Sequence, residues 1–390
     1  MRSNPEATTE PVVTVLFKNC NQYRVPFFRH LRNNLEQKGI DFRLVVGGGL
    51  PEDLAKGDIA SGSLPWAEER PFRSLTIAGH TLLWQPGLDL ARTSDLVITE
   101  QASKQLFNVV LSYGQRFVRA RHAFWGHGKN FQASIEGSAG EGLKKHLTKR
   151  AHWFFAYNDL STEAAVEFGM PRDRVTNVMN STDTVHMRDI RMALPASTAD
   201  DVRSELGIGD GPVAIYIGGI YRHKRPAFLV EAVEAIRELV PNFEMIVIGA
   251  GSEVDVIADA AQRHDWFHHL GARYGDERIR LASVAEIQLM PGLVGLNVVD
   301  GFALGLPTIT TDIDYHSPEI EYLLNGVNGV ITPADATPRE FASAAAAVLT
   351  NPARLDTLRA GAEIAGHELS IQDMARRFAD GIVQALRENA

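Results

Sequence analysis

Several features that would point to whole classes of protein are scarce in this chain of 390 residues. It has a single cysteine, Cys20, so it cannot form an intramolecular disulfide, and its composition suits a reducing cytoplasm. No run of about 18 apolar residues occurs, so we expect no membrane-spanning helix. The opening residues, MRSNPEATTEP, lack the apolar core of a signal peptide, and we expect residues 1–11 to be a flexible N-terminus.

An excess of positive charge is also absent. The net charge of −9 argues against general nucleic-acid binding, which favours a basic face. No cluster of histidines and carboxylates has the spacing of metal ligands, so we expect no metal and no other cofactor. The length favours two domains, and a hydrophobic content of 45% is enough for a large core.

The chain does contain short apolar runs that alternate with amphipathic helical segments. This alternation predicts parallel strands joined by helical crossovers. It pauses in the polar stretch Ser181–Asp201 and restarts with VAIYIGG. We therefore predict an α/β protein with two doubly wound, Rossmann-like domains, at residues 12–185 and 186–370, that face a central cleft. We expect a C-terminal helix at 371–390 to pack back on the first domain.

One glycine-rich stretch, LMPGLVGLNVVDGFALGLPTITTD (residues 289–312), is typical of a strand, a loop, a helix and a second strand. Glycines let backbone amides approach a ligand without interference from a Cβ atom. A helix start favours a phosphate or sugar oxygen. The alternative is tight packing of the loop itself.

This stretch resembles the signature of GT-B glycosyltransferases related to family four, which use sugar nucleotides and retain anomeric configuration. The matching positions are Pro291, Gly295, Gly305, Pro307 and the strand TITT. The segment SPEIEYLLNGVNGVITP is similar to the family's Pro-Glu pair followed by an Asn-Gly turn. The resemblance covers about Val213 to Leu349 and implies the GT-B fold, with the sugar nucleotide bound by the second domain.

The sequence departs from that pattern at three positions. Gly292 stands where the family has its first glutamate, and Asp300 replaces the second. In GGIYRHK, Gly219 replaces the arginine of the family's phosphate-binding stretch, whereas Lys224 is kept.

The resemblance implies a set of donor-binding residues. Lys224, with Arg222 in place of the missing arginine, would stabilise the departing diphosphate. Asp300 would accept hydrogen bonds from the ribose. The full set of donor-binding candidates is Gly218, Gly219, Lys224, Gly292, Leu293, Gly295, Leu296, Asn297, Asp300 and Glu319.

Candidates in the first domain begin with His127. Gly126 and Gly128 flank it in FWGHGKN, and in the resembled family a histidine at about this place contacts the transferred sugar. A lone histidine is also commonly structural. The acceptor-binding candidates are Asn21, Tyr23, Arg24 and Lys129.

A basic cluster lies in an otherwise acidic chain and comprises Lys144, Lys145, Lys149 and Arg150. Such a run is usually a solvated face. The alternative is docking to the anionic inner face of the cell membrane.

The leading hypothesis is a cytoplasmic glycosyltransferase of hexosyltransferase type. It would move a sugar from a nucleoside diphosphate sugar to a polysaccharide, glycolipid or lipid-linked acceptor, with retention. Two alternatives remain open at this point: a sugar-nucleotide epimerase of the same fold, and a non-catalytic subunit that supports a partner transferase.

Overall fold

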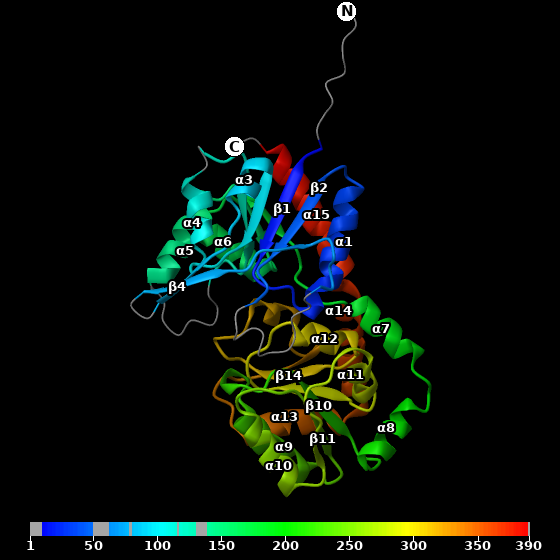
Figure 1. The fold of residues 1–390 in the computed structure, drawn as a ribbon. Coiled ribbons are helices and arrows are strands. Elements are labelled where there is room, and N and C mark those ends of the chain that lie inside the picture. The colour runs from blue at the N-terminus through cyan, green and yellow to red at the C-terminus, as the bar shows by residue number, and fades with distance from the viewer. Residues whose placement is uncertain (1–9, 50–61, 78–79, 115–116, 130–138, 389–390) are drawn as a thin grey trace, which may run out of the picture. The chain divides into compact units, whose positions relative to one another are not determined.

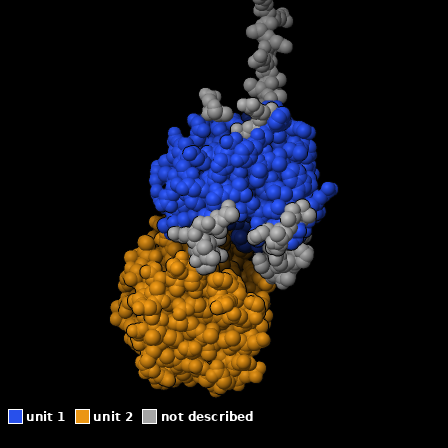
Figure 2. All heavy atoms as spheres, turned by 90° about the vertical axis from the view of Figure 1, so that its left-hand side faces the viewer, with its two compact units in different colours: residues 1–180, 371–390 blue, residues 181–370 orange. Residues whose placement is uncertain are grey.

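The structure, a computed structural model, describes residues 10–49, 62–77, 80–114, 117–129 and 139–388. The chain forms two compact units (Figure 2). Unit 1 comprises residues 1–180 and 371–390, and unit 2 comprises residues 181–370. The flexible N-terminus expected at residues 1–11 falls mostly on residues 1–9, which lie outside the described residues.

The boundary between the units lies at 180/181 instead of the expected 185/186. The physical reason is hydrogen bonding to the end of unit 2. The hydroxyls of Ser181 and Thr184 both donate to the carbonyl of Leu369, at 3.1 and 2.7 Å. These bonds attach the start of the polar stretch to unit 2.

The main sheet of unit 1 has, among the described residues, seven parallel strands in the order β3-β2-β1-β6-β7-β8-β9. The chain runs outward from β1 to β3 and then returns to the other side of β1, so β1 and β6 flank a topological switch point. The strands are β1 Val12–Phe17, β2 Asp41–Val46, β3 Glu68–Glu69, β6 Leu96–Glu100, β7 Arg121–Gly126, β8 Trp153–Ala156 and β9 Val175–Asn177.

Helices cover both faces of this sheet. On one face α1 (Val25–Glu36) packs beside α15 (Ile371–Arg387) around an aromatic core that includes Phe27, Trp125 and Phe378 (Figure 1). The other face is covered by α3 (Leu88–Thr93) and α4 (Leu106–Tyr113), whose apolar residues pack on β1 and β6. The remaining α-helices are α5 Ala139–Arg150 and α6 Asp159–Glu167, and the 3-10 turns are η1 Gln22–Arg24 and η2 Arg172–Arg174.

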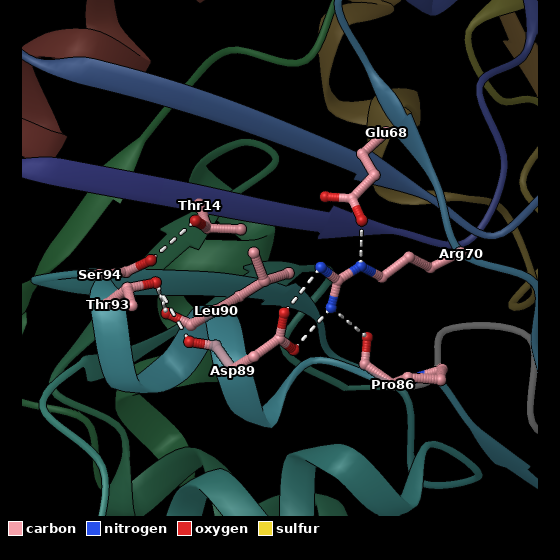
Figure 3. A network of polar contacts seen from close by, with 8 residues as sticks. All are labelled: Thr14, Glu68, Arg70, Pro86, Asp89, Leu90, Thr93 and Ser94. Carbon is pink, nitrogen blue, oxygen red and sulfur yellow. Dashed lines mark hydrogen bonds and ion pairs between the residues drawn. The ribbon is translucent and has the colours of Figure 1, made fainter.

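A hairpin of β4 (Arg73–Ile77) and β5 (His80–Trp84) is inserted between β3 and α3. Arg70 fixes the start of this insertion (Figure 3). Its guanidinium donates to Glu68 at 2.6 Å and to both carboxylate oxygens of Asp89 at 2.7 and 2.8 Å. These contacts hold the pKa of the Asp89 carboxyl below its usual range. Arg70 thus links the end of β3 to the first turn of α3, and the β4–β5 hairpin begins just after this link.

The sheet of unit 2 has, in the described part of the chain, six parallel strands in the order β12-β11-β10-β13-β14-β15. Its strands are almost entirely buried, as expected for a parallel sheet covered on both faces. The switch point of this unit lies between β10 and β13. The strands are β10 Val213–Ile217, β11 Glu244–Ile248, β12 Phe267–His269, β13 Ile287–Met290, β14 Thr308–Thr311 and β15 Gly329–Thr332.

The helices of unit 2 are set largely by local signals. In α13 (Pro338–Leu349), Thr337 and Glu340 form a reciprocal capping box, with hydrogen bonds of 3.2 and 2.8 Å. This helix packs on α9 (Pro226–Leu239) through the rings of Phe228 and Phe341. The other helices are α7 Thr184–Ala193, α8 Thr198–Leu206, α10 Val254–Arg263, α11 Gly275–Ala282, α12 Asn297–Ala303 and α14 Pro352–Glu368, and the 3-10 turns are η3 Arg222–Lys224 and η4 Pro318–Tyr322.

Candidate active site

Three loops meet at the carboxyl edge of the unit 2 sheet. They follow β10 (residues 218–225), β13 (residues 291–296) and β14 (residues 312–317). Because these strands are parallel neighbours, their carboxyl ends lie at one edge. Ligands of open α/β sheets bind at this edge, beside the switch point. The donor-binding candidates, apart from Asp300 and Glu319, lie on the first two of these loops or at their borders.

The loops after β10 and β13 are packed backbone against backbone. The amide of Leu293 donates to the carbonyl of His223 at 2.8 Å. A Cβ atom added to Gly292 would lie 2.4 Å from the carbonyl carbon of Lys224 and 2.5 Å from the oxygen of His223. A glutamate therefore does not fit at position 292 unless the loop after β10 moves, which explains physically why this position is glycine.

Lys224, near the end of the loop after β10, is buried and only 6% exposed. Its ammonium donates to the carbonyl of Leu293. Burial lowers the pKa of Lys224 to about 8, and the nearby carboxylate of Glu319 opposes that shift. Glu319, on η4, is 3% exposed. The structure thus brings together two of the predicted donor-binding residues as a buried cation and a buried carboxylate.

The neighbouring arginines take different positions. Arg222 is exposed on η3. Arg225 adopts a left-handed backbone conformation and donates to the carbonyl of Pro291 at 3.3 Å and to the hydroxyl of Thr311 at 3.1 Å. Arg225 therefore joins the loop after β10 to the ends of β13 and β14.

The first glycines of the loop after β10 are held close to two tyrosines. The Tyr216 hydroxyl donates to the carbonyl of Gly219 at 2.6 Å. A Cβ atom at Gly219 would lie 2.8 Å from the ring of Tyr221. Gly218 and Gly219 thus form a tight turn at the switch point, with no room for an arginine in the same backbone position unless Tyr221 moves.

His316 is a site residue that the sequence analysis missed. Its Nδ1 accepts the amide of Val294 at 3.0 Å, and its Nε2 donates to the carbonyl of Thr311 at 2.7 Å. This pattern needs a neutral imidazole, and burial, the largest effect, lowers the pKa of His316. The imidazole therefore fastens the loop after β13 to the end of β14. Its position just before the Pro-Glu pair, in DYHSPE, was the only available signal.

Three consecutive amides of the loop after β13 have protein acceptors. Leu293 donates to His223, Val294 to His316, and Gly295 to the side-chain oxygen of Asn297 at 2.8 Å. These hydrogen bonds hold the loop in shape, and the assignment of Leu293 and Gly295 to the donor stays a prediction. Leu296 and Asn297 lie at the start of α12.

Asp300 lies on α12 and has contacts through both carboxylate oxygens. One accepts the hydroxyl of Thr182 at 2.8 Å, and the other accepts Arg278 of α11 at 3.0 Å. A ribose would have to share the carboxylate with these groups. The ribose assignment therefore stays a prediction.

In unit 1, His127 follows β7 and is partly buried, with its ring 4.2 Å from that of Tyr157. Burial, together with the charges of Lys144 and Arg24, lowers the pKa of His127 to about 3, so the imidazole is neutral at physiological pH. The glycine after it has a packing role. A Cβ atom at Gly128 would lie 2.7 Å from that of Ala164 on α6. The flanking glycines are thus no sign of an open imidazole.

The acceptor-binding candidates are scattered in unit 1. Arg24 is 1% exposed, donates to Asn180 at 2.7 Å and stacks on the ring of Trp125. Its guanidinium therefore supports the core and has almost no surface for an acceptor. Tyr23 is 41% exposed, Asn21 precedes η1, and Lys129 is exposed with its ammonium 4.0 Å from Glu167.

The basic cluster on α5 does not form a single face. Lys145, Lys149 and Arg150 are exposed, whereas Lys144 is partly buried. Arg150 stacks on the ring of Tyr113 and donates to the carbonyl of Ser112. Among the described residues, no helix is long and apolar enough to cross a membrane, and no group of three or more His, Cys, Asp or Glu is placed to hold a metal ion.

The topology of the two units, two doubly wound parallel sheets each with a switch point, defines the GT-B fold, and solved structures confirm this class. The chain matches HepE from Anabaena in complex with UDP-glucose at 15% identity, over 95% of this chain and 99% of that one, with a TM-score of 0.68. It matches a glycosyltransferase from Rickettsia africae at 13% identity, over 97% and 100%, with a TM-score of 0.70. A UDP-N-acetylglucosamine 2-epimerase is similar at 13% identity, over 90% and 91%, with a TM-score of 0.59.

The family match is confined to unit 2. Residues 211–351 match the model of the family described as glycosyl transferases group 1. These residues contain all three loops of the site. The chain therefore carries a group 1 glycosyltransferase domain, which confirms the resemblance seen in the sequence. Among curated proteins, none matches this chain.

Proposed function

We propose that the chain is a hexosyltransferase that takes its sugar from a nucleoside diphosphate donor bound at the carboxyl edge of unit 2. The observation that carries this proposal is the meeting of three loops at the β10/β13 switch point, over the buried pair Lys224 and Glu319, within the segment matched by the family model. HepE, which shares the fold, is described in complex with UDP-glucose, and this supports a sugar-nucleotide donor.

The chemistry of the proposal rests on charge. The loop after β10 supplies two cations, the buried Lys224 and the exposed Arg222. Both stabilise the diphosphate as negative charge develops on it. Because the leaving diphosphate itself helps to deprotonate the acceptor, the reaction requires no protein base. The transfer proceeds with retention and without a metal, as in the family that the sequence resembles.

The acceptor in this proposal is a polysaccharide, a glycolipid or a lipid-linked glycan that binds to unit 1. The exposed Lys145, Lys149 and Arg150 of α5 support attachment to an anionic membrane on its cytoplasmic side. Each basic residue near such a surface adds about 1 kcal/mol.

A thermal-shift screen of nucleoside diphosphates and their sugars, with and without EDTA, tests the proposal. A ligand present at 100 times its Kd stabilises the folded protein by about 2.7 kcal/mol. We expect one nucleotide to raise the Tm whether or not EDTA is present, and its sugar to be consumed in the presence of acceptor. Absence of any shift overturns the proposal, consumption with isomerisation of the donor sugar indicates an epimerase, and binding without turnover indicates a non-catalytic subunit.

A further inference from the structure

A cavity lies at the switch point of unit 1. Its volume is about 270 Å³, and it lies where Lys18 follows β1 and where residues 100–105 end β6 and continue beyond it. This is the position at which open α/β sheets bind ligands. None of the residues expected to bind the acceptor lines it.

Three lysines from three separate segments line this cavity. Lys18 comes from the end of β1, Lys104 from the loop after β6, and Lys144 from α5. Two glutamates, Glu100 and Glu141, also line it, so the ionised side chains leave one net positive charge in a protein whose net charge is −9. The basic character of the cavity is therefore local.

The walls of the cavity are held in place by the chain itself. The carboxylate of Glu100 accepts the amide of Lys18 at 2.5 Å, which ties the end of β1 to that of β6. Gln101 donates to the hydroxyl of Thr148 at 2.6 Å, which ties the loop after β6 to α5. The three segments that carry the lysines are thus linked around one space.

We propose that this cavity binds a phosphate-like anionic group of the acceptor through Lys18, Lys104 and Lys144. Lysine ammonium groups bind phosphate oxygens as point charges, and a partly enclosed cavity strengthens that attraction. This inference deepens the proposed function and rests on it, because it assigns the substrate class that unit 1 presents for transfer.

Lys144 makes phosphate binding depend on pH. Burial lowers the pKa of this lysine, with Glu141 opposing the shift. An anion beside the ammonium raises that pKa again. Binding of phosphate is therefore accompanied by proton uptake at alkaline pH, and its affinity falls as the pH rises through the pKa of Lys144 in the free protein.

The test titrates inorganic phosphate into the full-length protein by calorimetry, at low ionic strength. The protein is first saturated with the nucleoside diphosphate that gives the largest thermal shift, so that the donor site is blocked. We expect a Kd on the order of 1 mM. Lys144→Gln and Lys104→Gln should each weaken binding about tenfold, the loss expected for one charge-assisted hydrogen bond. Lys144→Arg should restore it.

Lys145→Gln is the matched control, because this lysine is exposed on the same helix and does not line the cavity. It should leave phosphate binding unchanged. Absence of phosphate binding, or equal binding by wild type and the folded Lys104→Gln variant, overturns the proposal. If no nucleotide binds to wild type, the proposed function fails, whereas the comparison of Lys144→Gln with Lys145→Gln in phosphate still reports on this cavity.

Discussion

The two units place their switch points in the same topological position but use the space there differently. At the β10/β13 switch point of unit 2, the loops are interlocked: Gly292 lies against the backbone of Lys224, and His316 fastens the loop after β13 to the end of β14. At the β1/β6 switch point of unit 1, a cavity of about 270 Å³ remains, lined by lysines. The comparison thus separates a site of interlocked loops, which we propose for the donor, from a site with an open cavity, which we propose for the acceptor.

The largest effect should come from restoring the family's glutamate at position 292, beside the switch point of unit 2. Gly292→Glu places a Cβ atom 2.4 Å from the carbonyl carbon of Lys224 and adds a charge in a buried loop. We expect a loss of about 3 kcal/mol in the free energy of unfolding, together with loss of nucleotide binding. Urea denaturation and calorimetry measure the two effects.

Gly295→Ala is the control for that change. A Cβ atom at Gly295 meets nothing nearer than the Ser317 hydroxyl at 3.5 Å, an ordinary contact. This variant should keep its stability. If Gly292→Glu were as stable as Gly295→Ala, the description of the loops after β10 and β13 as interlocked would be wrong.

A change in unit 1 should affect transfer but not donor binding. If the imidazole contacts the transferred sugar, as the family resemblance implies, His127→Ala should lower the transfer rate at least about tenfold, or about 1.4 kcal/mol of transition-state stabilisation. The Kd of the diphosphate should stay within a factor of about two or three if the nucleotide binds to unit 2, as we propose. A fully active variant, or one that also loses nucleotide binding, would show that His127 is structural.

Asp300 sharpens the description of the donor site. If its carboxylate holds the ribose, Asp300→Ala should weaken binding of nucleotide and sugar nucleotide by the same factor, about tenfold. Arg278→Gln removes the ion pair but keeps the carboxylate, so it should weaken binding less. Slower transfer with unchanged nucleotide affinity would rule out the ribose assignment.

A further effect, which develops only as the pH falls, concerns the acid stability of unit 1. Burial lowers the pKa of the fully buried His122 to about 3, below the usual 6.5. Between these values the unfolded chain binds a proton that the folded chain does not, so stability falls as the pH drops below 6.5, by about 1.4 kcal/mol per pH unit. His122→Gln should flatten this slope by one proton.

Tryptophan fluorescence follows that transition, because four of the five tryptophans, Trp66, Trp84, Trp125 and Trp153, lie in unit 1. The control is His186→Gln in unit 2, whose side chain is exposed. An unchanged slope in His122→Gln would show that this histidine is not buried in its neutral form.

The parts of the fold that could be predicted from sequence depend on local signals. The alternation of apolar runs and helical segments is enough for the fold class, and the Thr337–Glu340 capping box marks the start of α13. The polar stretch Ser181–Asp201 was interpreted only as the domain boundary, and α7 and the start of α8 lie in it. Arg188 and Arg191 of α7 are held by Gly366 and Glu363, far along the chain, which no local pattern reveals. The strand β4 pairs with β5 in a separate hairpin and not with the main sheet, and local sequence does not reveal this choice either.

The residues of the candidate site also differ in whether local sequence could predict them. The position of Lys224 could be predicted because its spacing from the preceding strand matches the family pattern. His316 could not, since its importance depends on a contact with Val294, 22 residues earlier. The cavity of unit 1 could not be predicted either: Lys144 was noted only as part of the basic cluster, and only the fold brings Lys18, Lys104 and Lys144 together.

Whether the switch point of unit 2 binds the diphosphate of a sugar nucleotide is tested most directly by a calorimetric titration of Lys224→Met. This change removes the charge but keeps most of the side chain. We expect the Kd of the nucleoside diphosphate to rise about tenfold or more, whereas Lys145→Met, on the surface of unit 1, should bind as wild type does. A folded Lys224→Met variant that binds the diphosphate with wild-type affinity would show that the diphosphate does not bind at Lys224.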